Sequence, residues 1–117
     1  MIDKIKWDQV TEEWVSPNIS RRLVYLNNVM VAKLFLRKGT FVPEHHHESE
    51  QITWVFKGAL EFQIEGRKVV VGEGQVLPIP SNVPHAATAL EDTEEVDIFS
   101  PIRRDWLEGK DTYLRRT

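Results

Sequence analysis

Four side chains in this sequence are spaced so that they could bind one metal ion. His45 and His47 are two residues apart, which on a β-strand places both imidazoles on the same face. Gln51 follows a short polar stretch suited to a turn, so its amide can point to the same place from the start of the next strand. His85 opens a later strand. Three imidazoles and one amide oxygen suit a divalent transition metal such as Ni, Fe, Mn, Co or Zn, and do not suit Ca or Mg.

The same histidines also have a simpler explanation. A single histidine in a β-protein is usually a structural residue with its own hydrogen bonds, and histidine-rich surface loops are common. His46 points away from its two neighbours on a strand, and we therefore expect it to face solvent. The candidate metal ligands are then His45, His47, Gln51 and His85.

A second group of reactive side chains lies near the C-terminus. Asp97 and Phe99 are two residues apart on the last expected strand and share a face, and Arg103 follows where the chain can turn back. A buried carboxylate is costly unless it is paired, bound to a metal or catalytic. A guanidinium can hold a substrate carboxylate through two hydrogen bonds. Alternatively, Asp97 faces solvent, and Arg103 or Arg104 pairs on the surface with it or with Asp105.

Short β-strands must position these groups. Leu60, Phe62 and Ile64 alternate with polar residues, which is typical of a half-buried strand. Asn27 and Asn28 suit a tight turn between the first two strands. Many short strands with turn signals between them predict an all-β sandwich or barrel. The expected strands are residues 21–26, 29–37, 40–42, 45–47, 51–57, 59–65, 67–71, 76–79, 85–90 and 95–99.

The two ends of the chain differ from this central region. Trp7, Val10 and Trp14 suit one face of a short helix or an irregular arm, packed either on the domain or on a partner subunit. Residues 101–108 have a helical composition, and we expect residues 109–117 to be a polar surface segment.

Length and composition limit the class of protein. The 117 residues suit one domain, 1–117, with a barrel at about 20–100. The absence of cysteine excludes disulfides, thiolate chemistry and cysteine–zinc sites. The net charge of −3, with both signs mixed, favours neither nucleic acid nor an anionic membrane as a partner. The apolar runs are too short to span a bilayer and the N-terminus lacks a signal-like stretch, so we expect a cytoplasmic protein.

Glycines at fixed distances from the histidines resemble the first motif of the cupin superfamily. That motif is a glycine, five residues, His-x-His, three or four residues, a glutamate, six residues and a glycine. The stretch from Gly39 to Gly58 has this spacing, with Gln51 at the glutamate position.

The second cupin motif is similar to the stretch from Gly74 to Ala89. Asn82 replaces a glycine of the motif, and Ala89 replaces its final asparagine. Asparagine is the mild change, since it tolerates a positive φ better than most residues. The resemblance implies a cupin fold: a double-stranded β-helix, or jelly-roll barrel, with a short N-terminal arm and a short C-terminal helix.

Gln51 is the informative departure from the motif. With glutamine in place of glutamate all four expected ligands are neutral, so the ion keeps its full charge. We expect a stronger Lewis acid that prefers an anionic ligand such as a substrate carboxylate. A higher oxidation state is less well compensated, which counts against oxidase or dioxygenase chemistry. The alternative is that Gln51 marks a cupin without a metal.

The C-terminal run from Asp97 to Leu107, together with Gln51, looks like a narrower group. These are the small single-domain cupins of pectin and alginate breakdown, which ketonise unsaturated uronates. The resemblance implies a metal-dependent conversion of 4,5-unsaturated monouronates to linear ketonised sugars, with a small anionic sugar as substrate. It implies one divalent metal ion on His45, His47, Gln51 and His85, and roles in the reaction for Asp97, Phe99 and Arg103.

Two other functions fit the same residues. One is a different metal enzyme on the cupin scaffold, such as an isomerase or a dioxygenase. The other is a metal- or sugar-binding cupin without turnover.

We also expect a homodimer. Cupins of this size often pair through their sheets and exchange N-terminal strands. Ile52, Trp54 and Phe56 face away from Gln51 on their strand, and an apolar row of this kind needs cover.

Overall fold

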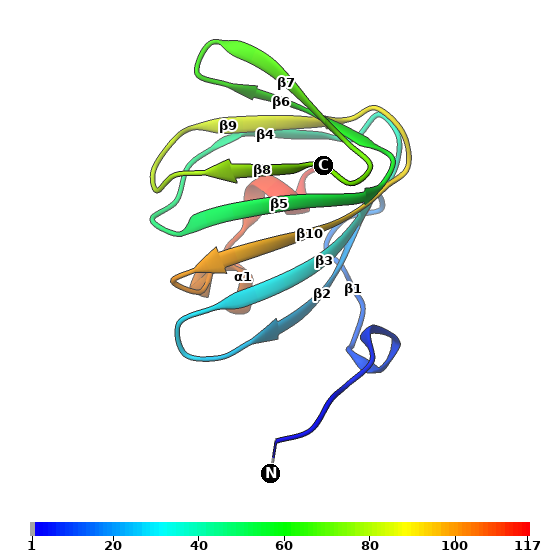
Figure 1. The fold of residues 1–117 in the computed structure, drawn as a ribbon, viewed down its shortest axis with the longest axis vertical. Helices are drawn as coiled ribbons and strands as arrows, with labels where there is room; N and C mark the ends of the chain where they lie inside the picture. The colour runs from blue at the N-terminus through cyan, green and yellow to red at the C-terminus, as the bar shows by residue number, and fades with distance from the viewer. Residues whose placement is uncertain (1) are drawn as a thin grey trace.

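The computed structural model describes residues 2–117, and half of them lie in two antiparallel β-sheets that face each other (Figure 1). The six-stranded sheet has the order β1-β2-β3-β10-β5-β8, and the four-stranded sheet has the order β4-β9-β6-β7. The predicted all-β barrel is confirmed. The strands are β1 (Glu13–Trp14), β2 (Ile19–Tyr25), β3 (Met30–Leu36), β4 (Phe41–His45), β5 (Glu50–Lys57), β6 (Ala59–Ile64), β7 (Arg67–Gly72), β8 (Val76–Ile79), β9 (His85–Ala89) and β10 (Thr93–Ser100).

The alternation of side chains on the strands sorts the sequence into an inner and an outer face. Met30, Ala32, Leu34 and Leu36 on β3 are all buried in the core between the sheets. Their neighbours on the strand are only partly buried. The pattern arises because successive side chains of a strand point to opposite faces of the sheet.

One end of the barrel interior is polar. On β5, Gln51 and Thr53 point inward, and they pair across the sheet with Phe99 and Asp97 of β10. Glu95 lies further along the same inner face of β10 and is also buried. Polar groups in an apolar interior need partners, and this end of the barrel contains the candidate site described below.

The β2–β3 hairpin turns where the sequence predicts. Tyr25 pairs with Met30 across the sheet, and the turn between them contains Asn27 and Asn28. The prediction of two separate strands at 40–42 and 45–47 is wrong. A single strand, β4, ends at His45 after an irregularity in its pairing with β9.

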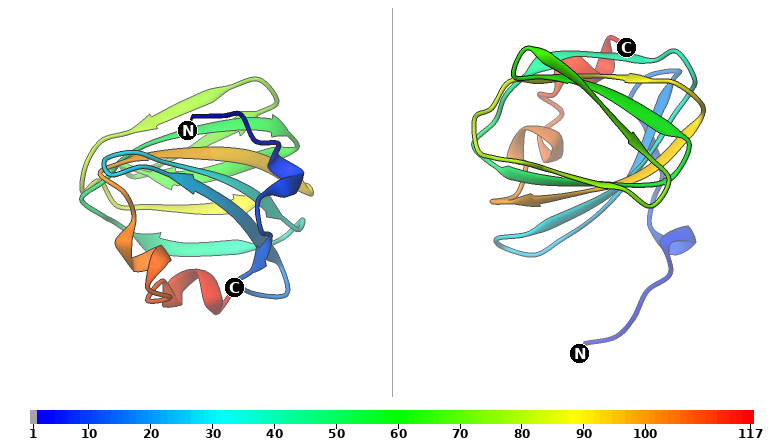
Figure 2. Two further views of the ribbon diagram at one scale, coloured as in Figure 1. Left: turned by 90° about the horizontal axis from the view of Figure 1, so that it is seen from below. Right: turned by 45° about the horizontal axis from the view of Figure 1, so that its top comes forward.

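The C-terminal part of the chain crosses one side of the barrel (Figure 2). It contains two short helices, α1 (Arg104–Leu107) and α2 (Thr112–Arg115), of which α2 packs against β4. The helical prediction is confirmed for α1, but the prediction that 109–117 is a polar surface segment is wrong. Asp111 and Leu114 of that segment are fully or almost fully buried.

The N-terminal arm begins with the 3-10 turn η1 (Trp7–Gln9) and continues into β1, which pairs with β2. Trp14 packs edge-on against Phe35 with ring centroids 6.2 Å apart. Its side chain is nevertheless 46% exposed, and the arm points away from the barrel (Figures 1 and 2). Among residues 2–117, no helix is long and apolar enough to cross a membrane.

Candidate metal centre

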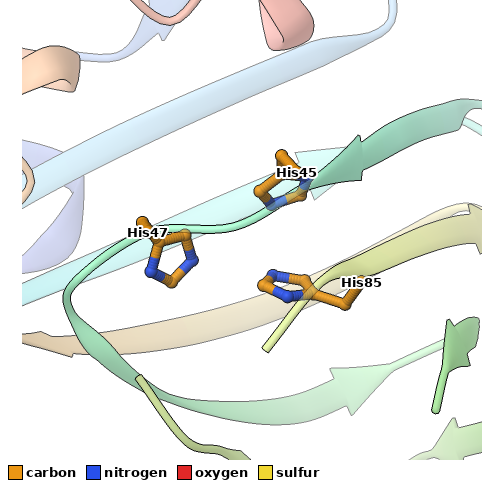
Figure 3. A group of neighbouring side chains, drawn as sticks. All are labelled: His45, His47 and His85. Carbon is orange, nitrogen blue, oxygen red and sulfur yellow. The ribbon is translucent and has the colours of Figure 1, made fainter. Parts of the chain in front are cut away.

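Three histidines meet inside one end of the barrel (Figure 3). His45 is the last residue of β4, His85 is the first residue of β9, and the two are register partners. His47 lies in the loop between β4 and β5, so the predicted strand position for it is wrong, although its ring reaches the same place. One ring nitrogen from each of the three lies within 4.8 Å of the others. His46 is exposed, as the sequence predicts.

Local hydrogen bonds orient all three imidazoles in the same way. Each Nδ1 is 2.8 Å from the carbonyl oxygen of a residue two positions away. A carbonyl oxygen can only accept, so each Nδ1 carries the hydrogen and each Nε2 keeps its lone pair. Such bonds fix the ring orientation of metal-binding histidines. The carbonyl groups belong to Pro43, Ser49 and Val83 for His45, His47 and His85, respectively.

Burial keeps these imidazoles neutral. It lowers the pKa of His45 to about 3 and, with the positive charge of Arg103, the pKa of His47 to about 4. The pKa of His85 is lowered in the same way, chiefly by burial. Neutral imidazoles are the form that binds a metal, so the group could hold a metal ion at neutral pH without first losing protons.

Gln51 presents its oxygen to the same place. Its side-chain nitrogen donates hydrogen bonds to Thr53 Oγ1 at 2.9 Å and to Asp97 Oδ1 at 3.3 Å. These two bonds fix which end of the amide is nitrogen, and Oε1 lies 3.1 Å from His47 Nε2. His85 Nε2 is buried and has no hydrogen-bond partner in the described part of the chain. The lone pairs of His47 Nε2 and Gln51 Oε1 therefore face each other, and that of His85 Nε2 has no donor within residues 2–117. These nitrogen and oxygen atoms would fit a divalent transition metal.

Asp97 is buried beside Gln51, as the first of the two sequence alternatives predicts. Its Oδ1 accepts a hydrogen bond from Thr53 Oγ1 at 2.7 Å in addition to the one from Gln51. Burial raises the pKa of Asp97 above its ordinary 3.8, against the opposing effect of hydrogen bonds from Glu95 and Thr53 and of the Arg103 charge. A carboxyl group that keeps its proton more readily is suited to general acid catalysis near neutral pH.

Glu95 is a site residue that the sequence reasoning missed. Its side chain is buried on the inner face of β10, next to Asp97, and Oε2 has no hydrogen-bond partner among residues 2–117. Burial, followed by the charge of Asp97 and a hydrogen bond with it, raises the pKa of Glu95 well above 4.5. The period-two rule that groups Asp97 with Phe99 also places Glu95 on that face, so the signal was present.

Arg103 follows β10 and closes one side of the centre. Its guanidinium lies 5.1 Å from the Phe99 ring and 5.0 Å from the Trp106 ring, within cation–π range. It forms an ion pair with Asp105, as one sequence alternative predicts, but the Arg103 side chain is only 4% exposed. Phe99 in turn meets His47 edge-on with ring centroids 5.7 Å apart.

Tyr113 of α2 is a second residue that sequence reasoning missed. Its ring stacks on His45 with centroids 4.3 Å apart. The only sequence signal was its residue type, because the burial of α2 depends on contacts with distant parts of the chain.

Two hollows meet at Arg103. The inner one is a cavity of about 50 Å³ in the barrel, bordered by His45, Gln51 and Asp97 and by apolar core side chains. The outer one is an open groove of about 260 Å³ beside His47. The inner cavity has room for only a few water molecules, whereas the groove approaches the size of a small-molecule site. Arg103 lines both.

The jelly-roll arrangement with histidines at one end of the barrel defines the class. The sequence matches the cupin domain family over residues 34–100. The chain therefore belongs to the cupin family, as its two motifs predict.

Within this family the chain is similar to the pectin degradation protein KdgF of Dickeya dadantii (strain 3937). The two sequences are 29% identical over 103 residues, which are 86% of this chain and 94% of the Dickeya protein. The structure is similar to that of KdgF from Halomonas sp., with a TM-score of 0.79 and 32% identity over 85% of this chain and 94% of the other. It is also similar to an RmlC-like cupin from Shewanella frigidimarina NCIMB 400, with a TM-score of 0.80 and 25% identity over 85% and 90% of the two chains.

Proposed function

We propose that this cupin converts 4,5-unsaturated monouronates from pectin or alginate breakdown to linear ketonised sugars. The observation that carries the proposal is the meeting of a neutral metal-ligand set with a buried acid and a buried guanidinium. Its similarity over most of its length to proteins named for pectin degradation supports the same substrate class.

The proposed ligands of one divalent transition metal ion are His45, His47, Gln51 and His85. When bound, the ion supplies Lewis-acid stabilisation of negative charge on a neighbouring oxygen. The ligands add no negative charge of their own, which favours an anionic substrate group beside them.

The proposed reaction is an isomerisation with no net gain or loss of atoms or electrons. In the substrate, the ring oxygen joins C1 to C5, and C5 carries the double bond to C4. The C1–oxygen bond breaks as the C1 hydroxyl loses its proton and C1 becomes an aldehyde. The oxygen left on C5 is an enolate oxygen, which becomes the oxygen of a ketone when C4 gains a proton.

Asp97 is the proposed acid that holds the proton for this step. Its burial raises the carboxyl pKa. Thr53 and Gln51 donate hydrogen bonds to Oδ1, and the proposed position of the exchanged proton is the other oxygen, Oδ2. General acid catalysis by a positioned carboxyl contributes roughly 10²–10⁴-fold to such steps.

Arg103 is the proposed binding group for the substrate carboxylate. Its Nη1 is buried and without a hydrogen-bond partner in the described chain, and the residue lines both the inner cavity and the outer groove. A substrate carboxylate that reaches Nη1 would satisfy this donor and lie close to the histidines. Phe99 packs beneath the guanidinium and beside His47, and its proposed part is to keep these two groups in place.

The test is incubation of the metal-loaded protein with lyase-produced unsaturated monouronates in D₂O. We expect loss of the ultraviolet absorbance of the double bond and an NMR spectrum of a ketone with deuterium at C4. Asp97→Asn should slow this loss by roughly 10²-fold or more, with metal content measured in parallel because Asp97 contacts Gln51. Recovery of unaltered sugar, or consumption of oxygen, would contradict the proposal and favour a binding cupin or a dioxygenase, respectively.

A further inference from the structure

The C-terminal tail, residues 109–117, is fixed to the barrel by buried charges. Arg21 of β2 and Asp111 form an ion pair in which neither side chain has exposed surface. Asp111 also accepts a hydrogen bond from Arg115 Nε at 2.9 Å. A buried ion pair of this kind is strongly destabilising to break. The tail therefore holds Tyr113 in one place beside the candidate centre.

The hydroxyl of Tyr113 is bonded to the guanidinium that the proposed function assigns to the substrate. Its oxygen accepts hydrogen bonds from Arg103 Nη2 at 2.8 Å and from Trp106 Nε1 at 3.0 Å. The ring, stacked on His45, is fixed at the same time. One side chain of the tail thus contacts a candidate metal ligand and the candidate anion-binding group.

Two acceptors determine how Arg103 is oriented. Asp105 accepts from Nε at 3.0 Å and from Nη2 at 2.8 Å, and Tyr113 accepts from Nη2. These bonds occupy one edge of the guanidinium and leave the Nη1 group on the other side. The side chain of Asp105 is 39% exposed. If Asp105 were the only acceptor, the guanidinium could move with it toward solvent.

We propose that Tyr113 is a positioning residue for substrate binding, which acts by holding Arg103 so that its free Nη1 group faces the ligand. The inference rests on the proposed function for the identity of the substrate, but the contact with Arg103 does not depend on turnover. The tail is then a fixed part of the site. If the tail merely covered the site, loosening it would ease access and would not weaken substrate binding.

The test compares Tyr113→Phe with wild type and with Tyr25→Phe. The phenylalanine keeps the ring on His45 and removes only the hydroxyl. Tyr25 is the other tyrosine of the chain, 48% exposed on the β2–β3 hairpin, and serves as the matched control. The measurements are calorimetric binding of galacturonate, a saturated uronate, followed by KM and kcat on the unsaturated monouronate, metal content and thermal melting.

We expect Tyr113→Phe to raise the galacturonate Kd and the KM roughly tenfold, the effect of one lost hydrogen bond to a charged group. The value of kcat, the metal content and Tyr25→Phe should change little. In an Arg103→Ala background the same change should have no further effect on Kd, because the group that Tyr113 positions is gone.

Unchanged or tighter galacturonate binding by Tyr113→Phe would overturn the inference, and so would a wild-type protein that does not bind galacturonate. An additional loss in the Arg103→Ala background would also overturn it, because Tyr113 would then act by another route. Binding of galacturonate by wild type without turnover of the unsaturated sugar would contradict the proposed function alone. The comparison of Kd values would still decide the role of Tyr113.

Discussion

The amide of Gln51 is oriented by the residues behind it. Thr53 and Asp97 accept its two nitrogen-bound hydrogens, so the oxygen faces the histidines. Glutamate, the residue of the cupin motif at this position, has no such hydrogens to donate and would place a second negative charge beside Asp97. The replacement of glutamate by glutamine therefore fits the buried acid next to it as well as the proposed metal ion.

Glu95 and Asp97 form a buried pair of carboxyl groups that must retain a proton. Both pKa values are raised, first of all by burial. Between the ordinary pKa of 4.5 and the raised pKa of the folded protein, Glu95 binds its proton more in the folded state than in the unfolded state. Its contribution to stability is therefore complete below about pH 4.5 and is lost as the pH rises toward the folded value.

Glu95→Gln removes this dependence because an amide does not titrate. We expect the free energy of unfolding of the variant, relative to wild type, to increase steadily as the pH rises above about 5. Urea unfolding of the metal-free proteins at a series of pH values measures the difference. A difference that stays constant with pH would show that Glu95 is not protonated in the folded protein.

At the scale of the elements, β10 and β5 place the acid and the amide side by side. Residues at matching positions on paired strands face the same side of the sheet, and Asp97 pairs with Thr53 next to Gln51. Strand alternation alone groups Asp97 with Phe99 and identifies Ile52, Trp54 and Phe56 as an outer face. This part of the site could be predicted from the sequence because it depends on local periodicity.

Other parts of the site depend on contacts between distant residues and could not be predicted in this way. His47 lies in the loop beyond the end of β4, and a hydrogen bond with the Ser49 carbonyl oxygen orients its ring toward the centre. Tyr113 is partly buried because Asp111 pairs with Arg21, which is 90 positions away in the sequence. The composition of residues 109–117 is polar, and nothing in the sequence around Asp111 indicates that it pairs with a buried arginine.

The anchoring of α2 makes a prediction at this scale. Asp111→Asn removes the buried charge paired with Arg21, whose other ionic partner is the half-exposed Glu13. The loss of the buried partner should lower the free energy of unfolding by about 3 kcal/mol. Glu108→Gln is the matched control, since its ion pair with Lys110 is exposed on both sides and should contribute less than about 1 kcal/mol. Urea unfolding compares the two. Equal effects would mean that the buried pair does not hold the tail.

At the scale of the whole molecule, an apolar row remains on the outside of the barrel. Ile52, Trp54 and Phe56 on β5 are 42–45% exposed, and Trp54 stacks on Phe56 with ring centroids 4.7 Å apart. Val76 of β8 pairs with Trp54 and is also exposed. Contiguous exposed apolar side chains of this kind commonly mark an interface, and we propose that a second copy of the chain covers them.

The dimer makes a prediction for solution behaviour. Sedimentation at micromolar concentration should give the mass of two chains, and Trp54→Glu should shift the protein toward the monomer without loss of metal. Lys57→Glu, on the same strand, is the control for a change of charge. A monomeric wild type would contradict the proposed dimer, because no second copy would then cover the apolar side chains of β5.

The most direct test of the central claim is turnover by the same preparation before and after its metal is removed. Elemental analysis should find about one divalent transition metal ion per chain in the active protein. Loss of the ultraviolet absorbance of an unsaturated monouronate should cease when a chelator removes the ion and return when it is restored. Full turnover by the metal-free protein, or a metal-loaded protein that leaves the sugar unchanged, would contradict the account.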